Sequence, residues 1–209
     1  MARRGEQLRE HILFTAKDVF LEAGFERASM DAVAGRAQTS KRSLYAHFEN
    51  KERLFLAVVE FVRGLFLTHL RTPDDHATEP EEALVQFCGR YLEVLLYEKS
   101  IQMCRVSMAE AARFPEGAAQ YFEVLFTQVH ARLSAYLAAV FGLSASEAEV
   151  AARRLLGLIL YPRFTRALFG VDALAPDFDH ERLSPDFDLR PVRAAVAEVL
   201  GSLDGHGAK

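Results

Sequence analysis

The sequence predicts an all-α fold of about nine helices arranged in two domains. Apolar residues recur at helical spacing through most of the 209 residues, and capping residues stand at the ends of these stretches. No segment shows the apolar–polar alternation that predicts a β-strand. The composition, 50% hydrophobic and 26% charged, is typical of a globular protein with a sizeable core.

Three compact helices and a long one are expected in the first 70 residues. Apolar side chains between residues 8 and 23 form one stripe, and Gly24 supplies a residue that ends the helix. Ser29 is a good N-cap for a short second helix, and Ser40 caps a third that extends to about residue 48. Asn50 can cap the fourth helix, which runs from Lys51 towards residue 70.

The later helices follow a loop at residues 73–80. Thr78 with Glu81, and Ser144 with Glu147, form capping boxes at two of the helix starts. Pro162 interrupts one helix, and a kink is expected there because proline removes a backbone donor. A loop is expected at 171–189. The predicted helices cover about 78–97, 101–114, 117–141, 144–169 and 191–203.

The charge differs between the two predicted domains, residues 1–55 and 56–209. The first carries a net charge of +2 and the remainder −6. This split would let the N-terminal domain face a polyanion such as a nucleic acid while the rest is repelled from it.

The second and third helices meet the packing requirements of a helix-turn-helix. Ala34 and Ala37 are small enough to let the third helix cross closely, and Leu44 and Phe48 would anchor its inner face. On a helical wheel, the side chains left outside or at the flanks are Lys41, Arg42, Ser43, Tyr45 and Ala46.

The outward side chains of this third helix suit insertion into the major groove of DNA. Arg and Lys can pair with guanine O6 and N7, and Ser with a base or a phosphate. Phosphates would be held at the helix N-termini of Ser29 and Lys51, by Tyr45 and by His47. The alternative is a solvated helix in a bundle, because charged exposed faces are common.

A motif extends over residues 8–56 with its order and spacing intact. It consists of Gly24-Phe25, Ala28-Ser29-Met30-Asp31, Val33-Ala34, Ala37, Ser40, Leu44-Tyr45, His47-Phe48, Lys51-Glu52 and Leu54. This stretch resembles the DNA-binding domain of the TetR family of bacterial transcriptional regulators. It departs from the family pattern at Gln38-Thr39, where Gly or Asn followed by Val is usual.

The resemblance implies a set of DNA-binding residues. Lys41, Arg42, Ser43 and Tyr45 would read bases or the adjacent backbone, and Ser29, His47 and Lys51 would hold phosphates. Gln38 and Thr39 do not come from the resemblance. They are added to the candidates because the altered turn places Gln38 where it could itself touch DNA.

The resemblance also implies a helical effector domain and a homodimer formed by the last two long helices, about 146–169 and 191–203. The segment Met108 to Pro115 is similar to part of an AefR-like C-terminal subgroup. A small lipophilic effector is expected. The candidate ligand-binding residues are Phe61, Phe66, Phe87, Tyr91, Met103, Met108, Phe122 and Phe126. Many of these side chains would serve only in packing, as aromatic residues at helical spacing usually do.

Other functional classes find less support in the sequence. No hydrolase, phosphate-loop or metalloprotease motif is present, so no catalytic residue is expected, nor a cofactor or metal site. Cys88 and Cys104 are expected to be buried, with a redox switch as the alternative. Neither a membrane span nor a secretory signal is expected, so a cytoplasmic location is predicted.

The favoured interpretation is therefore a homodimeric transcriptional repressor released from its DNA operator by the effector. A helical protein-binding adaptor without DNA affinity remains the alternative. Its support is the low basic charge and the unusual Gln38-Thr39 turn.

Overall fold

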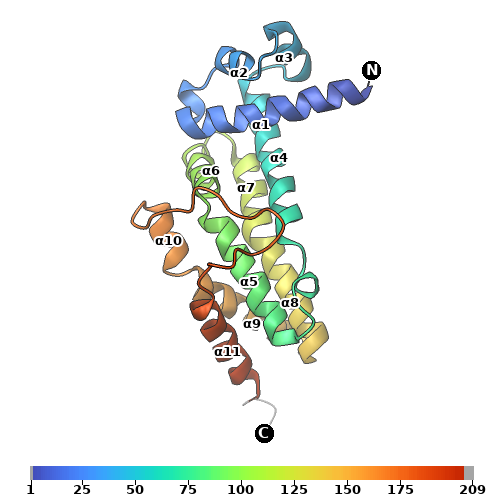
Figure 1. Cartoon of the computed structure of the whole chain (residues 1–209), viewed down its shortest axis with the longest axis vertical. Helices are drawn as coiled ribbons and strands as arrows, with labels where there is room; N and C mark the ends of the chain where they lie inside the picture. The colour runs from blue at the N-terminus through green and yellow to red at the C-terminus, as the bar shows by residue number, and fades with distance from the viewer. Residues whose placement is uncertain (1, 205–209) are drawn as a thin grey trace. The chain divides into compact units, whose positions relative to one another are not determined.

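The computed structural model describes residues 2–204 and is all-helical over that range (Figure 1), which confirms the predicted fold class. Residue 1 and residues 205–209, at the outer ends of the two predicted domains, lie outside the described residues. In chain order the elements are α1 (Ala2–Arg27), α2 (Met30–Arg36), α3 (Lys41–His47), α4 (Lys51–Leu70), the 3-10 turn η1 (Pro73–Asp75), α5 (Pro80–Leu96), α6 (Glu98–Ala109), α7 (Pro115–Phe122), the π-helix η2 (Glu123–Thr127), α8 (Gln128–Phe141), α9 (Ala145–Leu160), α10 (Arg163–Leu168) and α11 (Arg190–Asp204).

By their contacts the described residues form two compact units. Unit 1 holds α1 to α3 with α4 up to Leu65, together with Gln102–Tyr121. Unit 2 holds Phe66–Ile101 and the chain from Phe122 onward. Contacts between residues define these units, and they do not show where a domain that folds by itself would end. The predicted domain boundary between residues 55 and 56 therefore stays a prediction.

Unit 1 is built on a cluster of aromatic rings. Phe20, Phe25 and Phe55 are almost completely buried, and the rings of Phe20 and Phe25 each lie 5.2 Å from that of Phe55, edge to face. The ring of Phe114 joins them, 4.9 Å from Phe25 and 5.2 Å from Phe55. Such edge-to-face pairs add to the free energy gained from burying the rings. The segment before α7 is thus part of the same core as α1 and α4.

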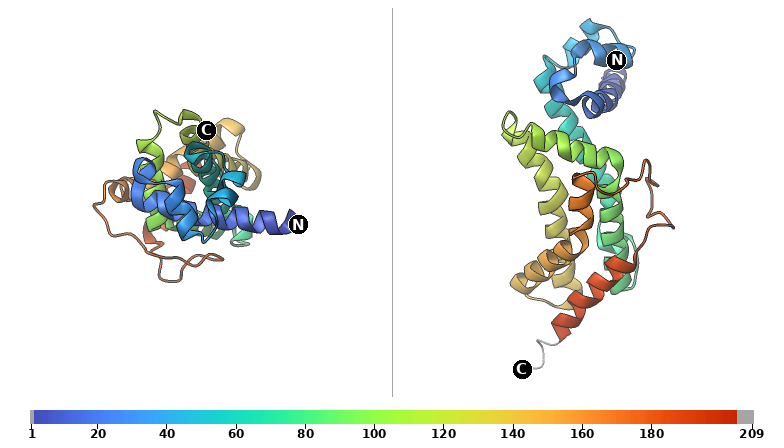
Figure 2. Two further views of the ribbon diagram at one scale, coloured as in Figure 1. Left: turned by 90° about the horizontal axis from the view of Figure 1, so that it is seen from above. Right: turned by 90° about the vertical axis from the view of Figure 1, so that its left-hand side faces the viewer.

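Unit 2 is a helical bundle crossed by an irregular segment. In it α9 packs against α8 and α11, and α11 packs back on α5. Residues 171–189, called the strap below, run along α5 without regular structure (Figure 2), as the sequence predicts. Gly89 lets the strap come close, because a Cβ there would lie 2.3 Å from Leu189 Cδ2.

Side-chain caps mark the starts of α2, α3, α4 and α9. Ser29, Ser40 and Asn50 each accept a backbone N–H in the first turn of the following helix, and Ser144 forms its capping box with Glu147. The capping box predicted at Thr78 is wrong. Helix α5 begins instead with a proline at its first position, where the missing N–H costs nothing.

Two predicted helices are divided in the structure. The stretch 117–141 contains the π-helix η2, and the stretch 144–169 breaks into α9 and α10 at the expected proline, Pro162. Pro115–Phe141 is long and apolar enough to cross a membrane by composition alone, and a third of its most apolar window is buried. One such helix is weak evidence, because core helices pass the same test, and α8, the C-terminal part of this stretch, packs against α9.

Candidate nucleic-acid interface

The third helix of unit 1, α3, is anchored on the face that the sequence predicts. Leu44 is fully buried and Phe48 is 4% exposed, while Ala34 and Ala37 are buried where α2 meets α3. His11 on α1 contacts the turn from the other side, with Nε2 3.2 Å from the carbonyl oxygen of Ala37. The inner face of α3 is therefore fixed by packing, and the side chains of its outer face do not contribute to the core.

The turn between α2 and α3 closes as a Schellman motif. The Thr39 N–H donates to the carbonyl of Ala34 at 3.0 Å, and the Gln38 N–H donates to that of Gly35 at 3.2 Å. Gln38 has φ 50°, in the left-handed region that glycine or asparagine adopts with less strain. The unusual residue at this position therefore strains the turn but leaves its hydrogen bonds intact.

The outer face of α3 presents the predicted base-reading residues. Lys41, Arg42 and Tyr45 are exposed, and Ser43 is half-buried with its N–H donated to the Ser40 hydroxyl oxygen. Within residues 2–204, the side chain of Arg42 makes no hydrogen bond or ion pair.

Lys41 differs from its neighbour because Asp31 of α2 holds it. The Lys41 Nζ donates to Asp31 Oδ2 at 2.7 Å, and both side chains stay nearly two-thirds exposed. The hydrogen bond from Lys41 to the Asp31 carboxylate, and then the attraction between their charges, raise the pKa of Lys41. Sequence reasoning missed this pair, although acids and bases ten residues apart across a tight turn are candidates for such contact.

The three predicted phosphate-binding residues lie in different surroundings. Ser29 accepts the Ala32 N–H, which leaves its own hydroxyl proton to donate. His47 is half-buried at the last position of α3, beside the Phe48 ring. The Lys51 Nζ donates to three carbonyls at the end of α1 and beyond it, those of Phe25, Glu26 and Ala28, at 2.9 to 3.1 Å.

Lys51 therefore serves as a cap for the end of α1. Its ammonium also lies 4.4 Å from the centre of the Phe25 ring, within range of a cation–π interaction. With all three N–H donors used, a phosphate contact at this position would fall to the backbone N–H groups that begin α4.

The segment similar to the AefR-like subgroup packs on the same aromatic core. The Arg113 guanidinium lies 5.1 Å from the Phe25 ring centre and forms an ion pair with Glu26. A Cβ on Gly117 would lie 2.9 Å from Leu56 Cδ2, so α7 approaches α4 closely. The segment around Arg113 and Gly117 therefore belongs to the same compact unit as the helix-turn-helix.

The predicted ligand-binding residues fall in both units. In unit 1, Met103 is buried, Phe61 is half-buried and Met108 is exposed. In unit 2, Phe66, Phe87 and Tyr91 are buried, and the Tyr91 hydroxyl donates to the Leu125 carbonyl in the π-helix at 2.8 Å. The remaining two, Phe122 and Phe126, share a surface groove.

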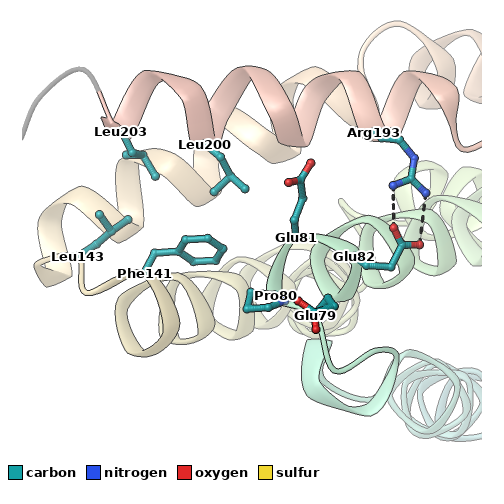
Figure 3. A pocket seen from close by; sticks show the side chains of 9 residues that line it. All are labelled: Glu79, Pro80, Glu81, Glu82, Phe141, Leu143, Arg193, Leu200 and Leu203. Carbon is teal, nitrogen blue, oxygen red and sulfur yellow. Dashed lines mark hydrogen bonds and ion pairs between the residues drawn. The ribbon is translucent and has the colours of Figure 1, made fainter.

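That groove has a volume of about 480 Å³ and a mainly apolar lining. Its lining residues are Phe122, Phe126, Thr127, His130, Arg153, Leu156, Gly157 and Leu160. A larger groove of about 750 Å³ lies between the start of α5, the end of α8 and α11 (Figure 3). There Arg193 donates to both Glu82 oxygens, at 2.6 and 3.3 Å, and none of the predicted ligand residues takes part.

The two thiols are buried, as the sequence predicts. Burial raises the pKa of Cys88 to about 12 and that of Cys104 to about 11, so both are protonated at neutral pH. Among residues 2–204, no three His, Cys, Asp or Glu side chains are placed to hold a metal ion.

Comparison with known proteins assigns the family. The family model described as "Bacterial regulatory proteins, tetR family" matches residues 12–58, and that of the AefR-like transcriptional repressor C-terminal domain matches residues 82–184. The chain belongs to the TetR family. Its N-terminal match covers the helix-turn-helix, and its C-terminal match extends into the strap.

Individual curated relatives match less than half of the chain. The activator FasR of Mycolicibacterium smegmatis is 43% identical over 63 residues, 28% of this chain and 29% of the relative. The repressor DhaR of a Mycobacterium species is 30% identical over 42% of this chain and 45% of the relative. The chain thus aligns with less than half the length of these relatives. A solved TetR-family regulator from Mesorhizobium loti shares the fold, with TM-score 0.74, 24% identity and coverage of 95% of this chain and 98% of that one.

Proposed function

We propose that this chain is a homodimeric, ligand-responsive repressor that binds a DNA operator through α3. The observation that carries the proposal is the division of α3 into a buried face, with Leu44 and Phe48, and an exposed face with Lys41, Arg42 and Tyr45. An anchored helix with outward cations and a phenol suits the major groove, where Arg and Lys pair with guanine. Two such helices in a dimer would enter grooves one turn, about 34 Å, or a multiple of that apart.

The apolar residues exposed on unit 2 support a dimer. Val150 and Leu158 on α9, with Tyr161 after it, are 58%, 39% and 72% exposed, and Phe169 after α10 is 86% exposed. Large apolar side chains left exposed to solvent mark candidate protein interfaces. Sedimentation velocity of the wild type and of Leu158→Glu checks this. A dimer that becomes a folded monomer is expected, and a wild-type monomer at micromolar concentration would contradict it.

The effector is proposed to be a small lipophilic molecule. Aromatic and aliphatic lining around a few polar groups, as in the groove of Phe122 and Phe126, is the kind of surface that takes such ligands. The proposal of repression rests on relatives described as repressors, NicS and DhaR, which align over 40% and 42% of this chain, against 28% for the activator FasR. A DNA-bound repressor acts in the cytoplasm, and no catalytic role is proposed.

Fluorescence anisotropy with labelled duplexes tests the DNA binding. The full chain should enrich a sequence from a random duplex library and bind it more tightly than a scrambled duplex of the same composition. Affinity should fall steeply as salt rises, since phosphate contacts release counterions. The double variant Lys41→Ala/Arg42→Ala should lose the preference while keeping its thermal unfolding midpoint. A wild type that enriches no sequence would overturn the proposal and favour the adaptor alternative.

A further inference from the structure

The ion pair between Asp31 and Lys41 places a carboxylate directly beside the expected DNA-reading surface. Lys41 is the first residue of α3, and Asp31 lies in the first turn of α2, two residues after the N-cap Ser29. The Nζ–Oδ2 distance of 2.7 Å makes this a direct charge-assisted hydrogen bond. The neighbouring cation of α3, Arg42, has no partner among the described residues.

Stability does not explain the pair. Both side chains remain nearly two-thirds exposed, at 65% and 63%, so water screens their attraction. Exposed pairs of this kind contribute little to folding and exchange readily with solvent. An acid at the N-terminal turn of α2 does favour the helix dipole, but it does so without a cation to bind.

The pair affects how much Lys41 can add to the affinity for DNA. If Lys41 leaves Asp31 to contact DNA, the carboxylate is left without its counter-charge close to the phosphates, where the potential is strongly negative. If Lys41 stays, the negative charge of Asp31 offsets its positive charge, so the pair adds little net charge for phosphate binding. Either way, contacts with the DNA backbone gain less from Lys41 than from a free lysine.

We propose that Asp31 is a specificity-determining residue: its carboxylate competes with DNA for Lys41, so that nonspecific DNA is bound weakly and Lys41 is released mainly to base-edge acceptors of the operator. The two acceptors of guanine, O6 and N7, can replace the carboxylate at a fixed position, whereas a phosphate on nonspecific DNA replaces it only by leaving Asp31 exposed to repulsion. The device disfavours wrong partners as well as favouring the right one. This inference rests on the proposed DNA binding.

The test compares Asp31→Asn with a matched control, Glu22→Gln. Glu22 is also a paired, exposed acid of unit 1, whose carboxylate accepts two hydrogen bonds from Arg36, at 2.5 and 2.7 Å. Both variants remove one negative charge from beside a cation, but only in Asp31→Asn does that cation belong to α3. Each is measured by anisotropy against the library-selected duplex and its scrambled counterpart over a salt series.

Asp31→Asn should bind the scrambled duplex about threefold to tenfold more tightly, with a smaller gain for the selected duplex. The logarithmic salt slope on scrambled DNA should steepen by about 0.9, the value for one added phosphate contact. In the Lys41→Met background, the Asp31→Asn change should no longer lower the ratio of the two affinities. Glu22→Gln should change both affinities by the same factor.

Two results would overturn the inference, and a third would defeat the proposed function on which it rests. An affinity ratio that Asp31→Asn leaves unchanged, or lowers no more than Glu22→Gln does, would reduce Asp31 to a general charge effect. A loss of affinity for the selected duplex would mean that Asp31 holds Lys41 in position for DNA. Failure of the wild type to prefer any duplex would instead defeat the proposed DNA binding, and it is seen before any variant is made.

Discussion

Two ion pairs of almost the same length lie in opposite surroundings in this chain. The Asp31–Lys41 pair on the helix-turn-helix spans 2.7 Å and is nearly two-thirds exposed, while the Arg90–Glu93 pair on α5 spans 2.8 Å and is 0% and 5% exposed. Distance therefore says little about what each pair does. Exposure decides whether a charged group is available to an outside partner or is committed to the fold.

The buried pair is committed because the strap needs it. The strap forms no helix or sheet, so its backbone groups must find side-chain partners where they are buried. Arg90 donates to the Arg182 carbonyl at 2.8 Å, and the second Glu93 oxygen accepts the Ser184 N–H at 3.1 Å. The Arg90 guanidinium also lies 4.9 Å from the Phe178 ring centre. One ion pair thus fastens an irregular segment to α5.

Breaking the buried pair should produce the largest effect. Glu93→Gln leaves the Arg90 charge buried without its counter-ion, and we expect a loss of about 3–5 kcal/mol in the free energy of unfolding. Urea denaturation followed by circular dichroism measures it. The double variant Arg90→Met/Glu93→Leu should be less destabilised than Glu93→Gln alone, because no charge is left stranded. Equal stability of Glu93→Gln and wild type would show that the pair is open to water.

Lys51 is intermediate between the exposed and the buried pair. It is partly buried, like a residue committed to the fold, but it lies in unit 1 beside the helix-turn-helix. Lys51→Met keeps the aliphatic stem and removes the donors to the Phe25, Glu26 and Ala28 carbonyls. A hydrogen bond from a charged group contributes about 1.5–3 kcal/mol to stability. We expect Lys51→Met to lower the free energy of unfolding by about 2 kcal/mol. Urea denaturation gives the stability, and anisotropy with DNA gives the affinity.

The control for Lys51 is Arg53→Met, which removes an exposed cation in the same turn of α4 and should leave stability unchanged. If Lys51→Met weakens DNA binding at full stability, the role of Lys51 is the phosphate contact that the sequence predicts, and the cap described here is secondary.

The turn of the helix-turn-helix stores strain that a single substitution should relieve. Gln38→Gly removes the side chain from a residue at φ 50°, and we expect a gain of about 1 kcal/mol in stability. Thermal unfolding measures this change. Gln38→Ala, which keeps a Cβ, should give no gain. A destabilised Gln38→Gly would mean that the Gln38 side chain makes a compensating contact.

The helix-turn-helix was the most predictable part of the chain. Its helices depend on local signals, such as the caps Ser29 and Ser40 and the anchors Leu44 and Phe48, and the structure bears out all four. The turn at Gln38 kept its geometry against the local preference because α2 and α3 pack on each other and carbonyl groups of α2 accept both hydrogen bonds of the turn. Local sequence reasoning could not weigh that tertiary contribution.

Unit 2 was less predictable because the contacts that hold it together join segments far apart in the sequence. Glu93 meets Ser184 across 91 residues, and no local pattern indicates such a contact. The same limit explains Lys51, whose partners lie more than 20 residues earlier in the chain. Sequence spacing identified the exposed face of α3, but only the folded chain shows that Lys41 on this face is bound by Asp31.

The smallest change in stability is expected at the exposed pair. Asp31→Asn should leave the thermal unfolding midpoint within measurement error, because water screens the attraction that it removes. Differential scanning calorimetry of Asp31→Asn beside Glu93→Gln makes the comparison directly. A clear destabilisation by Asp31→Asn would give the pair a structural role like that of Arg90–Glu93. An unchanged midpoint together with altered DNA discrimination would separate the two pairs: the same distance and charges serve folding where they are buried and recognition where they are exposed.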